Sequence, residues 1–106
     1  MTEKSLNLEE IVFNLVLHAG NARAKAYEAL DAAEEGKFEK SEKLLYEADE
    51  EFTQGHKYQS LLIQGKISEQ PSFLIIHSQD HLMTAMAEKN LIKRFIKIYK
   101  KLDKNN

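Results

Sequence analysis

The sequence contains no cysteine and no tryptophan, and it has only one proline and four glycines among its 106 residues. The lack of cysteine excludes a disulfide framework, a thiolate metal site and a cysteine nucleophile. Because helix breakers are rare, the connecting segments must be short. No apolar run approaches the roughly 18 residues of a membrane span, and the first residues do not resemble a signal peptide. We therefore expect a soluble, cytoplasmic protein with no direct insertion into a membrane.

The chain also lacks a large excess of either charge. Charged residues make up 30% of the sequence, yet they nearly cancel to a formal net charge of −2. This balance argues against nucleic-acid binding, which requires many phosphates to be neutralised. The basic segment KRFIKIYKKLDK near the C-terminus is typical of a solvated helix end. The length predicts a single domain over residues 1–106.

Two breaks divide the chain into three long helical segments. EEGKFEK contains Gly36, and GKISEQPS covers residues 65–72. Asn7, followed three residues later by Glu10, forms a capping-box pattern that predicts the start of the first helix. The third helix is expected to begin near Pro71 and to continue to about Leu102. The predicted fold class is all-α, a three-helix antiparallel bundle similar to a spectrin repeat.

Apolar and small residues in the first two segments recur at spacings of three and four, which indicates one buried face on each helix. In the second segment, Ala48 and Gly55 would permit close helix approach. Phe13 and Leu17 lie off the main face of the first segment, and such surplus apolar surface favours a homo-oligomer. The two predicted faces are Ile11, Leu15, Ala19, Ala22, Ala26, Leu30 and Ala33, and Phe38, Ser41, Leu45, Ala48, Phe52, Gly55, Gln59 and Leu62.

The string HSQDH at residues 77–81 places two of the four histidines and an aspartate between apolar pairs at 75–76 and 82–83. On a helical wheel, His81 lies about 40° from His77, and Asp80 lies about 60° away in an apolar arc. An ionised carboxylate in apolar surroundings is costly unless it meets a cation, a metal or hydrogen-bond donors. The string is therefore a candidate functional site.

The residue types alone leave three interpretations of this string open. In the first, His77 and His81 are satisfied core residues and Asp80 is paired locally. In the second, the histidines share a metal ion, although zinc would need more ligands than one chain offers, because Glu88 is two turns from His77. In the third, His77 is phosphorylated, since imidazole is nucleophilic near neutral pH. Hydrogen-bond donors for a phosphoryl group would then be Ser78, Gln79, His81 and Thr84.

The longer string HSQDHLMTAM resembles the signature of the enzyme IIA component of the lactose/cellobiose (N,N′-diacetylchitobiose) family of the bacterial sugar phosphotransferase system. The typical form is His-Ala-Gln-Asp-His-Leu-Met-Thr, and only Ser78 departs from it. Upstream, HAGNARAKAYEALDAAEEGKFEKSEKLLYEA is similar to the family's first helix, glycine turn and second helix. The resemblance covers nearly the entire chain.

This resemblance implies a phosphohistidine carrier, a transferase component rather than a stand-alone enzyme. His77 would accept a phosphoryl group at Nε2 (tele) from the histidine-containing phosphocarrier protein. It would pass the group to a cysteine of enzyme IIB during uptake of a β-disaccharide of the cellobiose, chitobiose or lactose type. Gln79 and His81 would have supporting roles.

The family resemblance further implies a homotrimer in which His77 faces a groove between subunits. Asp80 from three subunits would meet at the axis and hold one divalent ion, usually magnesium, which would offset their mutual repulsion. The alternative hypothesis is a non-catalytic helical assembly module that uses the same residues only for a structural metal site.

Overall fold

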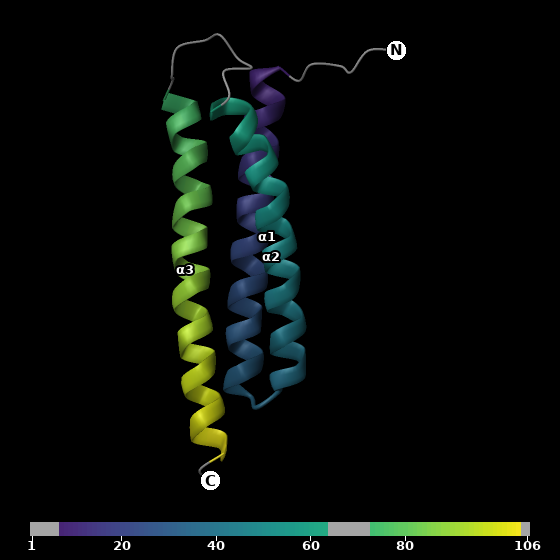
Figure 1. Ribbon diagram of the computed structural model, residues 1–106, viewed down its shortest axis with the longest axis vertical. Coiled ribbons are helices and arrows are strands. Elements are labelled where there is room, and N and C mark those ends of the chain that lie inside the picture. Colours follow the sequence, from purple (N-terminus) through teal and green to yellow (C-terminus); the bar gives the residue numbers. More distant parts are fainter. Residues whose placement is uncertain (1–6, 64–72, 105–106) are drawn as a thin grey trace.

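The computed structural model describes residues 7–63 and 73–104, which form three helices and, within those ranges, no strand. The helices are α1 (Leu8–Glu34), α2 (Phe38–Ile63) and α3 (Phe73–Lys104). Figure 1 shows that α2 runs antiparallel to both α1 and α3. The predicted all-α, three-helix bundle is confirmed. The predicted break at 65–72 and the helix start near Pro71 lie outside the described residues.

Local interactions set both ends of α1, through side chains at its start and through the backbone at its end. The Glu10 amide donates to Asn7 Oδ1 over 2.8 Å, and the Asn7 amide donates to Glu10 Oε1 over 3.3 Å, so the predicted capping box is confirmed. At the other end, Gly36 has φ +78°, a left-handed conformation that glycine adopts without a steric penalty. The Lys37 and Gly36 amides then donate to carbonyls of the last turn of α1 and close the helix.

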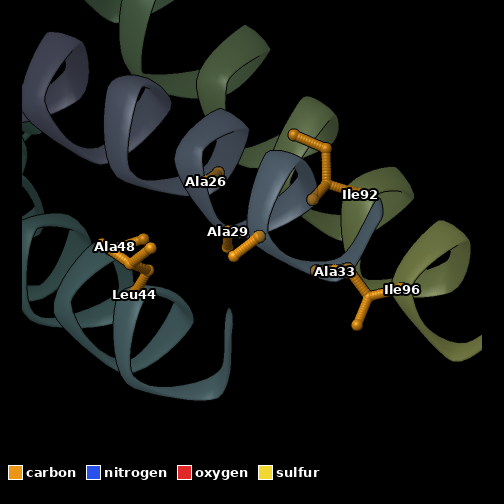
Figure 2. Close-up of a cluster of buried hydrophobic side chains, with 8 residues drawn as sticks. Ala26, Ala29, Ala33, Leu44, Ala48, Ile92 and Ile96 are labelled. Carbon is orange, nitrogen blue, oxygen red and sulfur yellow. The ribbon is translucent and has the colours of Figure 1, made fainter. Parts of the chain in front are cut away.

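Helix α1 is the central packing element, because it lies along both other helices whereas α2 and α3 touch each other much less. Its buried face is built mainly from alanine, which lets neighbouring backbones come close. Figure 2 shows one core cluster, where alanines of α1 meet side chains of α2 and α3. The residues labelled there are Ala26, Ala29, Ala33, Leu44, Ala48, Ile92 and Ile96.

The three helices pack tightly around Gly55 of α2. A Cβ atom at this position would lie 3.0 Å from Leu82 Cδ1 of α3 and 3.7 Å from His18 Cβ of α1. The close approach predicted from the small residues of the second segment is therefore confirmed at Gly55. Leu82 is fully buried and lies in the same helix turn as His81, so this contact helps to position the candidate site.

Apolar side chains also remain exposed on the outside of the bundle, as the surplus outside the predicted core face indicated. On α1, Phe13, Leu17 and Tyr27 are exposed. On α3, the exposed large apolar residues recur along one helical face. We call this set of residues the α3 stripe. It consists of Ile76, Met83, Leu91, Phe95, Ile98 and Leu102.

Replacing Gly55 by leucine should lower the free energy of unfolding by about 1–3 kcal/mol, because the new side chain overpacks the contact with Leu82. Gln54→Leu, an exposed change on the same helix, is the control and should change stability by less than about 0.5 kcal/mol. Urea unfolding followed by circular dichroism measures both. Equal stability of the two variants would contradict the close packing described here.

Candidate functional site

The orientation of α3 about its own axis is set by three fully buried residues, Ser78, Leu82 and Ala85. Ser78 occupies the position at which the resembled signature has alanine. Its hydroxyl donates to the Ile75 carbonyl over 2.7 Å, so the extra polar atom is satisfied within the helix. With this face turned into the core, His77 and Asp80 lie on the exposed side of α3.

The two imidazoles of the predicted site are in contact. His77 Nε2 and His81 Nε2 are 3.1 Å apart, and the rings meet edge to face at a centroid distance of 4.6 Å. At this distance one nitrogen carries the proton and donates while the other accepts, because two protons or two lone pairs would repel. His77 is exposed and His81 is half-buried, so the interpretation of His77 as a core histidine is wrong.

Asp80 is exposed within a single chain. The large apolar residues beside it on the helical wheel, Ile76 and Met83, belong to the α3 stripe and not to the core of the single chain. An exposed carboxylate keeps its contact with water, so its desolvation cost in this setting is small. It lines a surface pocket of about 280 Å³ together with Arg23, His77, His81 and Thr84.

Helix α1 supplies the opposite wall of this pocket through Arg23. The Arg23 Nε–H donates to Glu88 Oε1 over 2.5 Å, and Nη2–H donates to Thr84 Oγ1 over 2.7 Å. The Thr84 hydroxyl also lies 2.7 Å from the Asp80 carbonyl. Arg23 therefore ties α1 to the two turns of α3 that follow His77.

Glu88 accepts hydrogen bonds on both carboxylate oxygens. Arg23 donates to Oε1, and the Tyr27 hydroxyl donates to Oε2 over 2.6 Å. The hydrogen bond from Tyr27, followed by that from Arg23, lowers the pKa of the Glu88 carboxyl below its ordinary value. The same bond raises the pKa of the Tyr27 hydroxyl, because loss of its proton beside a carboxylate is unfavourable. Glu88 is thus an ionised partner of Arg23 at neutral pH.

Gln79 lies on a different side of α3 from the pocket. Its Oε1 accepts a hydrogen bond of 2.7 Å from Gln59 Nε2 of α2. Gln59 in turn contacts His56 Nδ1 over 2.8 Å. Within one chain the structure therefore brings His77, Asp80 and His81 together around the pocket, and it does not bring Gln79 to them.

Among the described residues, no group of three or more histidine, aspartate or glutamate side chains is placed to hold a metal ion. Asp80 offers one carboxylate, whereas Glu88 is already bonded to Arg23 and Tyr27. A complete metal site within one chain is not formed by these residues. The predicted ion shared by three chains remains a prediction.

The other two histidines have separate surroundings. His18 Nδ1 is 2.7 Å from Glu51 Oε1, and the His18 ring stacks on Tyr58 at a centroid distance of 5.9 Å. These contacts join α1 to α2. His56 lies exposed on α2 beside Gln59.

Comparison with known families identifies the chain more closely than the site geometry can. The family model for the lactose/cellobiose-specific IIA subunit of the PTS system matches residues 10–100. The chain belongs to this family. The resemblance carried by HSQDHLMTAM is confirmed, and the chain is a component of a sugar phosphotransferase system. Membership also decides against the alternative of a non-catalytic assembly module.

Curated relatives of this IIA chain are IIA components specific for different sugars. It is 41% identical over 98 residues to the lichenan-specific phosphotransferase enzyme IIA component of Bacillus subtilis, which covers 90% of this chain and 89% of the relative. It is 46% identical over 92 residues to the lactose-specific EIIA component of Staphylococcus epidermidis, which covers 84% and 88%.

Solved structures of IIA proteins share the fold. The cellobiose-specific enzyme IIA of Bacillus anthracis superposes with a TM-score of 0.88 at 39% identity, and the match covers 97% of both chains. The IIA(Chitobiose)–HPr complex of Escherichia coli gives a TM-score of 0.84 at 32% identity, covering 93% of this chain and 99% of the other.

None of the three described helices combines the length and apolar character that crossing a bilayer requires.

The Glu88 network predicts a pH-dependent contribution to stability. A carboxyl whose pKa is lowered on folding stabilises the folded chain above its unfolded pKa, and this contribution is lost as pH falls through the folded value. Glu88→Gln should therefore lower the free energy of unfolding at neutral pH by at most about 1 kcal/mol, since the side chain is partly exposed. The free energies of unfolding of wild type and Glu88→Gln should converge at pH values well below 4.5, the ordinary pKa of a glutamate carboxyl.

Urea unfolding across this pH range measures the difference between wild type and Glu88→Gln. Glu50→Gln removes an exposed carboxylate from α2 and serves as the control, with little effect expected at neutral pH. A constant difference between wild type and Glu88→Gln at every pH would contradict the assignment of the lowered pKa to Glu88.

Proposed function

We propose that this IIA chain is a phosphohistidine carrier in which His77 is the phosphoryl acceptor. The observation that supports this role best is an exposed imidazole beside a second imidazole in an open polar pocket. A carrier needs a nucleophile that partner proteins can reach, together with nearby donors that stabilise charge on the phosphoryl oxygens. His77 has both features, and His18 lies instead in a contact between helices.

The transfer step exchanges one phosphorus–nitrogen bond for another. The lone pair of a neutral His77 nitrogen attacks the phosphorus of the donor's phosphohistidine, while the bond to the donor imidazole breaks and its electron pair returns to that nitrogen. The second His77 nitrogen keeps its proton, so no net proton is released. In the onward step a cysteine thiolate of enzyme IIB attacks the same phosphorus, and His77 recovers its lone pair.

The contact with His81 favours Nε2 of His77 as the attacking atom, the tele position. A His81 Nε2–H that donates to the His77 Nε2 lone pair keeps that nitrogen unprotonated, as nucleophilic attack requires. After transfer, the same N–H would lie near the phosphoryl oxygens and could donate to them. His81 therefore has a supporting role in this proposal, whereas Gln79 would have to act across a subunit boundary.

The proposed partners follow from the family. Two related structures are of IIA(Chitobiose) in complex with HPr, which supports the histidine-containing phosphocarrier protein as donor to this chain. Enzyme IIB is the proposed acceptor. The relatives for lichenan, lactose and N,N′-diacetylchitobiose support a β-disaccharide as the transported sugar.

We also propose that three chains associate through the α3 stripe. A run of exposed apolar side chains along a whole helix is stabilised when a second surface covers it. Asp80 lies within this run, since Ile76 and Met83 are its neighbours one turn before and after it. Association along the stripe would carry Asp80 from solvent into an interface. The pocket with His77 would then border the same interface.

Magnesium, at one ion per trimer, fits the chemistry of Asp80 in that arrangement. A carboxylate oxygen is the ligand type that hard divalent cations prefer, and one from each chain would surround the axis. The bound ion would supply positive charge where three carboxylates otherwise repel each other. This role is structural, and it leaves phosphoryl transfer to the residues of the pocket.

Incubation with phosphoenolpyruvate and the two general proteins of the phosphotransferase system should add one acid-labile phosphate per chain. His77→Ala should abolish the labelling, because the attacking nitrogen is lost. His56→Ala, which removes an exposed imidazole from α2, is the matched control and should be labelled normally. Phosphate analysis and mass spectrometry measure the outcome, and full labelling of His77→Ala would show that another residue is the acceptor.

Asp80→Leu should remain trimeric and should no longer respond to a chelator, since an apolar residue in the stripe removes both the repulsion and the need for an ion. The wild-type trimer should loosen when the divalent ion is removed. Sedimentation with and without chelator measures both proteins, with Glu50→Leu on α2 as the control for loss of a carboxylate. A monomeric Asp80→Leu variant would contradict the placement of Asp80 in the interface.

A further inference from the structure

The geometry points to Arg23 of α1 as the residue that binds the phosphoryl oxygens after His77 is phosphorylated. This inference rests on the proposed function and adds a residue that the HSQDH string does not contain. It assigns Arg23 as a direct ligand of the transferred group, with Glu88 as the anion that competes for the same guanidinium.

The charges around the pocket require such a ligand. Phosphorylation brings a group with a charge of about −1.5 to −2 into a pocket that the Asp80 carboxylate already lines. Two anions at close range repel unless a cation lies between or beside them. Of the five residues that line the pocket, Arg23 is the only lysine or arginine. It is therefore the permanently charged cationic side chain that this pocket offers to the phosphoryl group, whereas the proposed ion would be bound by Asp80.

The hydrogen bonds of Arg23 leave it able to take this role. Glu88 accepts from Nε–H and Thr84 accepts from one Nη2–H, so further N–H groups of the guanidinium remain for phosphoryl oxygens. The same two bonds fix the guanidinium at the pocket wall before phosphate arrives. A donor that is already held in place costs little reorganisation when charge develops. The planar guanidinium also matches the geometry of phosphate oxygens.

Glu88 determines how strongly the positive charge of Arg23 can attract the phosphoryl group. Its carboxylate is ionised, and hydrogen bonds from Tyr27 and Arg23 hold it in place. The Arg23 charge is therefore shared between Glu88 and any bound phosphoryl group. Glutamine at position 88 would keep an oxygen to accept from Arg23 Nε and would remove the competing charge. Loss of charge at Arg23 and loss of charge at Glu88 should thus have opposite effects on phosphohistidine.

Nearby cations on the described helices are engaged elsewhere. Lys25, two residues from Arg23, pairs with Glu47 of α2 over 3.0 Å. Lys89, one residue from Glu88, pairs with Asp49 over 2.8 Å. Neither lines the pocket. Lys25 therefore offers a matched control, because its replacement removes one positive charge from the same helix without touching the site.

The test measures the equilibrium constant for phosphoryl transfer from the histidine-containing phosphocarrier protein to the full-length chain, by phosphorus NMR at several protein ratios. Arg23→Gln should lower this constant about 10- to 100-fold, the loss expected for charge-assisted hydrogen bonds. Glu88→Gln should raise it, and Lys25→Gln should leave it unchanged. Arg23→Lys should fall between wild type and Arg23→Gln, because lysine keeps the charge but not the planar fork.

A purely structural role for Arg23 gives a different pattern. If Arg23 acts only by bracing Glu88, then Arg23→Gln and Glu88→Gln should lower the constant alike, and that result would overturn the assignment. Equal constants for Arg23→Gln and Lys25→Gln would overturn it as well. If circular dichroism shows that Arg23→Gln does not fold, Glu88→Gln provides the test. An equilibrium constant for phosphoryl transfer that does not rise in Glu88→Gln would contradict competition between Glu88 and the phosphoryl group for Arg23.

The wild-type measurement separates this inference from the proposed function. A wild-type chain that takes no phosphate refutes both the carrier role of His77 and the role of Arg23. A wild-type chain that is phosphorylated at His77, with Arg23→Gln unaffected, refutes only the role of Arg23.

Discussion

The burial of Ser78, Leu82 and Ala85 of α3 is the constraint on which the site depends, and Leu82 and Ala85 share a core cluster with residues of α1 and α2. This packing fixes the orientation of α3 about its axis, and the orientation decides that His77 and Asp80 face outward. A rotation of α3 by one residue would turn His77 into the core. The alanines of α1 make the packing possible, because larger side chains would hold α3 too far away for Arg23 to bond Thr84 and Glu88.

The site itself is a balance of charges on two helices. Helix α3 contributes the imidazoles and two carboxylates, and α1 contributes the guanidinium of Arg23 that bonds one of those carboxylates. Within the imidazole pair, an N–H of one ring can donate a hydrogen bond to the nitrogen lone pair of the other ring. In the proposed function, a phosphoryl group on His77 would add negative charge to this pocket, and the neighbouring side chains would have to stabilise it. In the proposed carrier, residues beyond the signature string would therefore take part.

Local signals in the sequence were sufficient for the fold. Asn7 with Glu10 and the turn at Gly36 are short-range patterns, and the structure forms both. The helical wheel correctly grouped His77 with His81, but it could not tell which apolar arc of α3 faces the core, since both arcs contain large aliphatic residues. Arg23 was missed because 61 residues separate it from Thr84. Only the packing of α1 on α3 brings the two together.

The α3 stripe has a thermodynamic consequence for the whole chain. In the proposed trimer, the free energy gained by covering these apolar side chains is released only when chains meet, so folding and association are linked equilibria. The apparent melting temperature would then increase with protein concentration. Dilution would favour an isolated subunit with an uncovered apolar flank, and such flanks are prone to non-specific aggregation. The cellular abundance of the chain would thereby become one determinant of its stability.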